Sequence, residues 1–257
     1  MSALSTPSSP PPFPLHYIIT PPPSTQELSK THALTHEPPF AIYASSQLTG
    51  RGTSNRTWYS PPGNLYLTIA LPSAPYKQPG FPLTLLPLHV GVVTYHAVKS
   101  ALKDTPNADL VELKWPNDVL LDGKKVSGTI IEYNGADTFF VGIGINVNVA
   151  PVIPSTGGDN GRESTCLAEY GLPVSDAEEA VGLVARAVVD GFYADSTPNP
   201  ADIVAKFGEG MRFGKEVRIR SKGMEMVVPV ALQEDGQLVV EVVGTKEVRV
   251  LSAEYLL

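Results

Sequence analysis

The chain has 257 residues, of which 42% are hydrophobic and 18% are charged, so it can bury a substantial core and is not a disordered polymer. Its formal net charge is −7 and its basic residues form no dense block, which argues against a nucleic-acid partner. No apolar run is long enough to cross a bilayer, and the N-terminus lacks the apolar segment of a secretion signal. With a single cysteine, these features predict a cytoplasmic protein.

The N-terminal residues 1–23 contain eight prolines. We expect an extended tail without helix or sheet, with ordered structure beginning near Ser24. Short apolar runs predict strands at Phe40–Ala44 and Asn64–Leu71, joined by a glycine-rich loop. The three- and four-residue spacing of apolar side chains predicts an amphipathic helix over Leu85–Leu102.

A group of strands is expected next. The dipeptide Asp122-Gly123 predicts a hairpin between Val119–Leu121 and Lys125–Tyr133. A strand at Leu110–Leu113 precedes the hairpin, and a long one at Thr138–Val149 follows it. The last strand contains two glycines, which indicates that something approaches its backbone closely.

The C-terminal third begins with residues 152–163, which are polar and glycine-rich and predict a loop. Ser175 with Glu178 forms a capping box for a helix reaching Phe192, and a shorter helix is expected at Ala201–Phe207. Four short strands after Phe213 predict an all-β module of about 45 residues. The order of these elements predicts an α+β protein with an appended β domain.

The loop Gly50–Trp58 is the first candidate for chemistry. Its glycines allow close approach to a ligand, and Arg51 and Arg56 offer forked donors for carboxylate or phosphate. Trp58 offers a flat face for an adenine. The spacing is not that of a P-loop. Alone, a surface turn with two solvated arginines is an equal alternative.

The second candidate is Lys114-Trp115-Pro116-Asn117-Asp118. Lys114 follows a buried strand, where it could neutralise a carboxylate and a phosphate together. Asn117 and Asp118 could orient a nucleotide or a magnesium ion. A strand-end lysine before a plain turn is the alternative.

The third candidate combines Lys125–Glu132 with Gly142–Asn148. Gly128 would let a planar ligand lie against a strand, and Asn146, at the end of an apolar run, could read an adenine edge. The alternative is a hairpin core with ordinary glycines.

Together and in this order, the three motifs resemble the biotin protein ligase family. That family has a Gly-Arg-Gly loop followed by Trp and Ser-Pro-x-Gly-x-Leu, then Lys-Trp-Pro-Asn-Asp, then a strand Lys-x-x-Gly and a Gly-Ile-Gly-Ile-Asn segment. The resemblance covers residues 24–169 and extends weakly beyond them. It implies a mixed β-sheet catalytic domain with helices packed on it at 24–210 and an SH3-like β-barrel at 211–257, after the tail 1–23.

The resemblance also implies roles for individual residues. Catalysis would rest on Lys114 and Arg51. The biotin contacts would be Ser24, Thr25, Gln47, Gly50, Arg51, Lys114 and Gly128. The ATP contacts would be Gly52, Arg56, Trp58, Asn117 and Asn146, with Asp118 as a magnesium ligand. The family's usual second loop arginine is Thr53 here, which bears on how tightly a reactive adenylate is retained.

The implied reaction joins biotin to AMP with ATP and Mg²⁺, then transfers biotin to a lysine on the carrier domain of a carboxylase. Two alternatives remain: a lipoate or octanoate ligase of the same fold, and a non-catalytic biotin-binding protein. Because the 23 residues before the catalytic domain are few and proline-rich, we expect no DNA-binding domain. Family members are monomers or homodimers, and the sequence does not choose between them.

Overall fold

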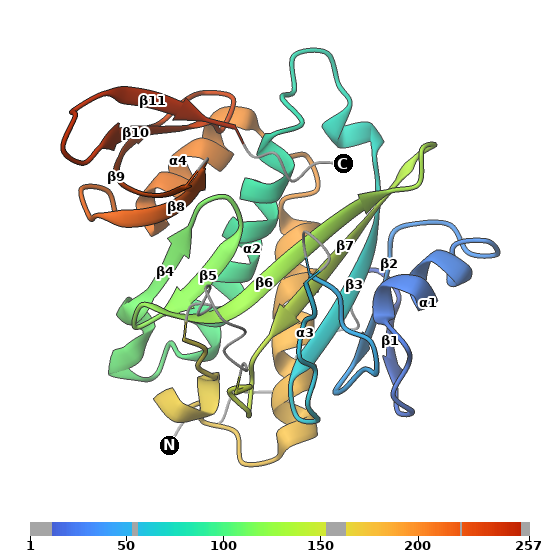
Figure 1. Cartoon of the computed structure of the whole chain (residues 1–257). Helices are drawn as coiled ribbons and strands as arrows, with labels where there is room; N and C mark the ends of the chain where they lie inside the picture. The colour runs from blue at the N-terminus through green and yellow to red at the C-terminus, as the bar shows by residue number, and fades with distance from the viewer. Residues whose placement is uncertain (1–11, 53–55, 153–162, 222, 253–257) are drawn as a thin grey trace.

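The computed structural model describes residues 12–52, 56–152, 163–221 and 223–252 (Figure 1). Its main element is a seven-stranded sheet of order β1-β2-β3-β7-β6-β5-β4. The strands are β1 Leu15–Ile18, β2 Phe40–Ala44, β3 Leu65–Pro72, β4 Val111–Lys114, β5 Asp118–Leu121, β6 Lys124–Tyr133 and β7 Thr138–Ile145. Only β1 and β2 pair in parallel, and the other neighbours are antiparallel. The mixed sheet agrees with the expected fold class.

One face of the sheet carries the main core. Here α2 (Leu85–Ala101) packs against α3 (Ala177–Ala194) and α4 (Pro200–Gly210). The odd-numbered residues of β3 and β7, such as Leu67 and Ile143, point into this core. Because side chains alternate along a strand, the even-numbered residues face the other side. Among the described residues, no helix has the length and apolar character needed to span a membrane.

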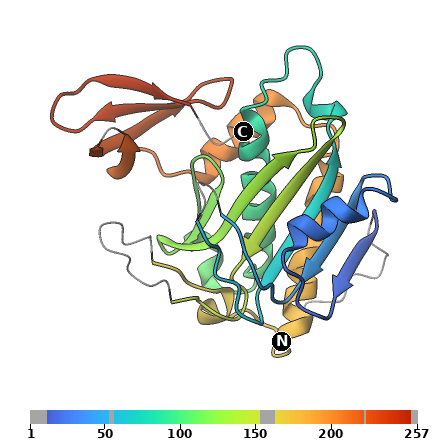
Figure 2. The same cartoon turned by 45° about the vertical axis from the view of Figure 1, so that its right-hand side comes forward.

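The opposite face of the sheet is only partly covered. The short helix α1 (Thr25–His32) lies across β2 and β3, in front of the sheet in Figure 2, while α2 and α3 lie behind it. A small cluster around Phe40, Ile42 and Phe140 packs beneath α1. Trp58, from the loop that follows β2, packs on this face against Gly128 and Gly144.

The C-terminal module is a four-stranded antiparallel sheet of order β11-β10-β9-β8 with its own apolar core, as an SH3-like module would have. Its strands are β8 Val217–Ser221, β9 Gly223–Leu232, β10 Leu238–Val242 and β11 Val248–Leu251. The indole N–H of Trp115 donates to the carbonyl oxygen of Gly236 at 2.9 Å, which ties the module to the turn between β4 and β5. The described residues also form short 3₁₀ helices at Ala74–Tyr76, Pro106–Leu110 and Leu167–Tyr170.

Several expectations about elements need correction. The proline-rich segment is not free of sheet, because β1 lies within it. These four residues contain no proline and can therefore donate to a ladder. The helix cap is Asp176 rather than Ser175, since the Asp176 carboxylate accepts the Glu179 N–H. The strand expected to reach Val149 ends at Ile145, and most of the expected 152–163 loop lies outside the described residues.

Candidate functional site

Three glycines form a strip on the open face of the sheet. Gly128 of β6 pairs with Gly144 of β7, and Gly142 lies two residues away on the same face. A Cβ built on Gly144 would lie 2.5 Å from Nε1 of Trp58, and one on Gly128 would lie 2.8 Å from its Cζ3. The indole ring therefore rests on the backbone of both strands. We call Gly128, Gly142 and Gly144 the glycine strip.

Trp58 reaches the strip from a small hairpin. The backbone N–H of Trp58 donates to the carbonyl of Gly50, and Arg51 bridges Thr57 across the same turn. Gly50 cannot carry a side chain, because its Cβ would lie 2.1 Å from the carbonyl oxygen of Trp58. The tip of the hairpin, residues 53–55, lies outside the described residues, so Thr53 has no structural account.

The N-terminal end of α1 borders the strip at Gly142. Ser24 caps the helix by accepting the N–H of Gln26, and Thr25 donates its backbone N–H to Gln47 Oε1 at 3.2 Å. The Gln26 side chain lies against Gly142, where an added Cβ would be 2.7 Å from its Oε1. All three helix residues are at most 4% exposed. Their polar groups therefore sit against the glycine strip and away from bulk solvent.

Lys125 borders the opposite end of the strip, and Asp118 joins it to a second lysine, Lys114. Nζ of Lys125 lies 2.7 Å from Oδ1 of Asp118, and Nζ of Lys114 lies 3.1 Å from Oδ2. Burial alone would raise the pKa of Asp118, but the two ammonium groups outweigh it and hold that pKa below its ordinary value. Lys125 is the nearer lysine, because its Nζ lies 3.0 Å from the Cβ position of Gly128 and 5.4 Å from the centre of the Trp58 ring.

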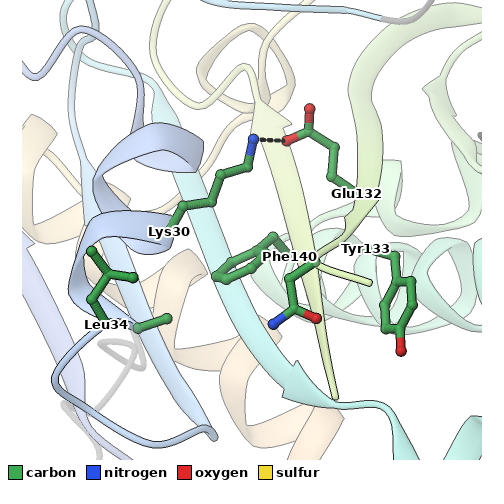
Figure 3. Close-up of a pocket in the computed structure, with 7 residues that line it drawn as sticks. Lys30, Leu34, Glu132, Tyr133 and Phe140 are labelled. Atoms are coloured by element: carbon green, nitrogen blue, oxygen red, sulfur yellow. Dashed lines mark ion pairs between the residues drawn. The ribbon is translucent and has the colours of Figure 1, made fainter. Parts of the chain in front are cut away.

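Two carboxylates hold the side chain of Arg51. Its guanidinium lies 2.5 Å from Oε1 of Glu27 and 3.3 Å from Oε2 of Glu132. The Lys30 ammonium group forms ion pairs with both carboxylates. Figure 3 shows its side chain pointing toward Glu132 across the pocket beside α1. Burial raises the pKa of Glu132, but hydrogen bonds from Gln26 and Lys30 and the charge of Arg51 lower it overall. Leu34, Tyr133 and Phe140 also line this pocket, whereas the three glycines of the strip do not.

Asn146 follows β7 and is 1% exposed. Its side-chain nitrogen donates to the carbonyl oxygen of Thr165, while Oδ1 has no hydrogen-bond partner among the described residues. The next turn is held by Asn64, whose Oδ1 accepts three backbone N–H groups, from residues 147 to 149. An unpaired acceptor in a buried position suits a ligand donor such as an amino group.

The structure thus gathers most of the expected residues. Gly128 is part of the strip, and Ser24, Thr25, Gln47, Gly50 and Trp58 lie around it. Lys114 is joined through Asp118 to Lys125 at one end of the strip. Asn117 is placed by its backbone against Gly91 of α2, and Gly52 and Arg56 lie near the hairpin tip. The Arg51 guanidinium is paired with Glu27 and Glu132. Sequence reasoning assigned no role to Lys125, although Lys125 stands within the quoted Lys-x-x-Gly motif.

Among the residues that the structure describes, no three His, Cys, Asp or Glu side chains are arranged to hold a metal ion. Both oxygens of Asp118 already face lysines, so a metal contact there would displace one of them. The described residues therefore offer no dedicated magnesium cage.

Comparison with known proteins extends this description. The family model described as the biotin/lipoate A/B protein ligase family matches residues 18–148. Among curated relatives, the bifunctional ligase/repressor BirA of Bacillus subtilis is 31% identical over 134 residues, which is 50% of this chain and 39% of BirA. The chain thus matches about two fifths of that relative's length.

Solved structures match nearly the whole chain. The biotin protein ligase of Leishmania major in complex with biotin is 30% identical with a TM-score of 0.67, covering 95% of this chain and 100% of that one. The biotin protein ligase of Aquifex aeolicus in complex with biotin and ATP is 28% identical with a TM-score of 0.69, covering 93% and 99%. The family match spans just over half of the chain, and it includes the hairpin, the lysine pair and the glycine strip. The chain belongs to the biotin/lipoate A/B protein ligase family.

Proposed function

We propose that this protein activates biotin with ATP to form biotinyl-5′-AMP, and then transfers biotin to a lysine on the carrier domain of a carboxylase. One observation carries the proposal: the glycine strip is covered by an indole, with buried hydroxyl and amide groups at one end and two lysines at the other. A flat bicyclic head with an anionic tail fits this arrangement of groups. The solved Leishmania and Aquifex relatives, which hold biotin, support this reading.

In the first step, a biotin carboxylate oxygen attacks the α-phosphorus of ATP. A C–O–P anhydride forms, and the bond from the α-phosphorus to the bridging oxygen breaks to release pyrophosphate. The carboxylate is ionised at neutral pH, so no general base is needed. The main barrier is the electrostatic repulsion between the two anions as they approach each other. Lys125 and Lys114 would lower this barrier by placing positive charge beside them. Asp118 holds the two ammonium groups together at the end of the strip.

In the second step, the amine of the acceptor lysine attacks the acyl carbon. An amide forms, the acyl–oxygen bond breaks to release AMP, and the amine loses a proton. Asp118 is poorly suited to take that proton, because a carboxylate whose pKa is held below its ordinary value is a weak base. The proton would therefore pass to solvent or to the carrier.

ATP contacts would come from the hairpin and from Asn146, whose unpaired buried Oδ1 can accept an adenine amino hydrogen. Magnesium would enter with the nucleotide as MgATP, since such ions are commonly held by phosphates and few protein carboxylates. Trp58, which now covers the strip, must move or share the strip with the ligand.

The single cysteine and the sequence pattern support a cytoplasmic location. The biotin-carrier partner follows from the reaction, and the −7 charge argues against a nucleic-acid partner.

The test is exchange of labelled pyrophosphate into ATP, measured with biotin, with lipoate and with neither. Exchange that depends on biotin supports the proposal. Exchange that depends on lipoate instead would show the related ligase, and the absence of exchange would show a binding protein without this chemistry.

A further inference from the structure

Both chain neighbours of Lys114 are held by residues that follow α4. Leu113 forms a parallel β-bridge with Met211, which packs against the core of the C-terminal module. On the other side, the indole N–H of Trp115 donates to the carbonyl oxygen of Gly236, in the turn between β9 and β10. The backbone of the lysine proposed for the activation step is therefore held from two directions by the C-terminal part of the chain.

The strand that carries Lys114 lies at the edge of the main sheet. β4 has four residues and pairs with β5 alone within that sheet. Beyond the sheet, Gly210 packs so closely on Leu113 that an added Cβ would lie 2.8 Å from its Cδ1. The Arg212 guanidinium also lies 2.8 Å from Oε1 of the buried Glu112. This short edge strand is thus anchored by the segment that leads into the module.

Trp115 connects the two hydrophobic cores. Its half-buried ring packs against the main core and also against the core of the module. Gly236 has a φ of +80°, a left-handed conformation that favours glycine, and an added Cβ would lie 2.8 Å from Cδ2 of Leu85. The Thr84 hydroxyl donates to the carbonyl oxygen of Asp235 in the same turn. The acceptor of the Trp115 N–H is therefore fixed against the first turn of α2.

The side chain of Lys114 is less constrained than its backbone. It is 39% exposed, and its Nζ lies 3.1 Å from Oδ2 of Asp118. Because a lysine side chain is a flexible four-carbon stem, the position of its ammonium group depends on the backbone from which it starts. A displacement of about 1 Å in a reacting site can cost about 10²-fold in rate. The hydrogen bond from Trp115 fixes the residue next to that starting point.

We propose that Trp115 is a positioning residue for Lys114: through its hydrogen bond to Gly236, the C-terminal module fixes the lysine that faces the two anions of the activation step. The inference rests on the proposed biotin function and gives the module a part in the first reaction. The charge of Lys114 acts where negative charge builds up in the transition state. A displaced ammonium group should therefore lower kcat more than it changes KM.

The test begins with biotin-dependent pyrophosphate exchange by the wild type. Absence of exchange at this stage refutes the proposed function itself, independently of Trp115. Trp115→Phe then keeps an aromatic ring and removes the N–H group. Since one of the two anchors beside Lys114 remains, we expect kcat to fall about tenfold, with the KM values for biotin and ATP within about twofold of wild type.

Asn107→Ala is the matched control. The Asn107 side chain is also half-buried, and its N–H also donates to a backbone carbonyl oxygen distant in sequence, that of Tyr170, at 3.0 Å. This contact joins two segments away from the module. The control variant should keep kcat within about twofold of wild type, and a loss equal to that of Trp115→Phe would overturn the inference.

The decisive comparison repeats Trp115→Phe in a Lys114→Met background. If Trp115 acts through Lys114, its replacement should have no further effect once the ammonium group is gone, so the double variant should match Lys114→Met within about twofold. A substitution that only reduced the folded fraction would lower kcat by the same factor in both backgrounds. That result would overturn the inference, as would a wild-type kcat in Trp115→Phe.

Gly236→Ala provides a second route to the same contact. The added methyl group pushes the turn away from Leu85 while Trp115 stays intact. We expect kcat to fall in the wild-type background and to stay unchanged in the Lys114→Met background. Thermal unfolding of each variant accompanies the kinetics. If Trp115→Phe does not fold, Gly236→Ala must meet the same two criteria, and failure of either one overturns the inference.

Discussion

Replacing Gly144 with alanine tests whether the glycine strip is the floor of the ligand site. The new methyl carbon would lie 2.5 Å from Nε1 and 2.6 Å from Cε2 of Trp58. Comfortable contacts between such atoms are about 3.5 Å or longer, so the indole must lift by about 1 Å. The neighbouring β6 backbone cannot give way without breaking its pairing with β7.

A ligand resting on the strip would be lifted by the same methyl group. A misplacement of about 1 Å can cost about 10²-fold in rate, and we expect a loss of this size in kcat/KM for biotin in the exchange reaction. Stability should change by less than about 1 kcal/mol, because the hairpin carrying Trp58 can rise and alanine favours a strand more than glycine does.

The assay is biotin-dependent pyrophosphate exchange, with urea unfolding of the same protein. Gly208→Ala in α4 is the control, since its nearest neighbour beyond the local chain lies 4.0 Å away. We expect that variant to keep full activity. A Gly144→Ala protein with wild-type kcat/KM for biotin would show that the ligand does not lie on this strip.

Three further predictions follow from other parts of the structure. Lys125→Met should slow exchange by about 10² to 10³-fold and more than Lys114→Met does, because Lys125 is closer to the strip; equal rates in the two variants would contradict this order. Asn64→Ala should destabilise the protein by about 2–4 kcal/mol in urea unfolding, because three backbone N–H groups lose their acceptor; a change below about 1 kcal/mol would argue against that. Burial and the charges of His36 and His16 hold the pKa of His32 below 6.5, so the unfolded chain binds more protons below that pH. The free energy of unfolding therefore keeps its full value above pH 6.5 and falls as the pH drops toward the pKa of His32 in the folded protein. Urea unfolding of His32→Gln should show a smaller loss of stability between pH 7.5 and 5.5 than the wild type.

The elements with strong local patterns were predictable. The strand Phe40–Ala44 agrees with β2 at both ends, and the helix at Leu85–Leu102 differs from α2 by one residue. The helix α1 was not predicted, because it buries Thr25, Gln26 and Ser29 rather than an apolar stripe. A helix whose inward face serves a polar site leaves little hydrophobic signal.

The candidate site was predictable where one motif supplied neighbouring residues, and less so where the pairing of strands decided the geometry. Gly128 and Gly144 come from the two segments of the third candidate, and only the register of β6 and β7 places them opposite each other. The contact of Arg51 with Glu27 and Glu132 joins three segments distant in sequence. No pattern within one segment carries that information.

The position of Lys125 could not be predicted from the sequence pattern of its strand. Strict alternation along β6 would put Lys125 and Gly128 on opposite faces, because they are three residues apart. The pairing with β5 shifts, however: Val119 pairs with Ser127 while Leu120 pairs with Lys125, which leaves Val126 as an extra residue. This β-bulge turns Val126 into the main core and brings Lys125 to the face of the glycine strip. A local departure from regular strand geometry thus coincides with the residue that the proposed reaction needs most, as expected where a fold is shaped by a site rather than by packing alone.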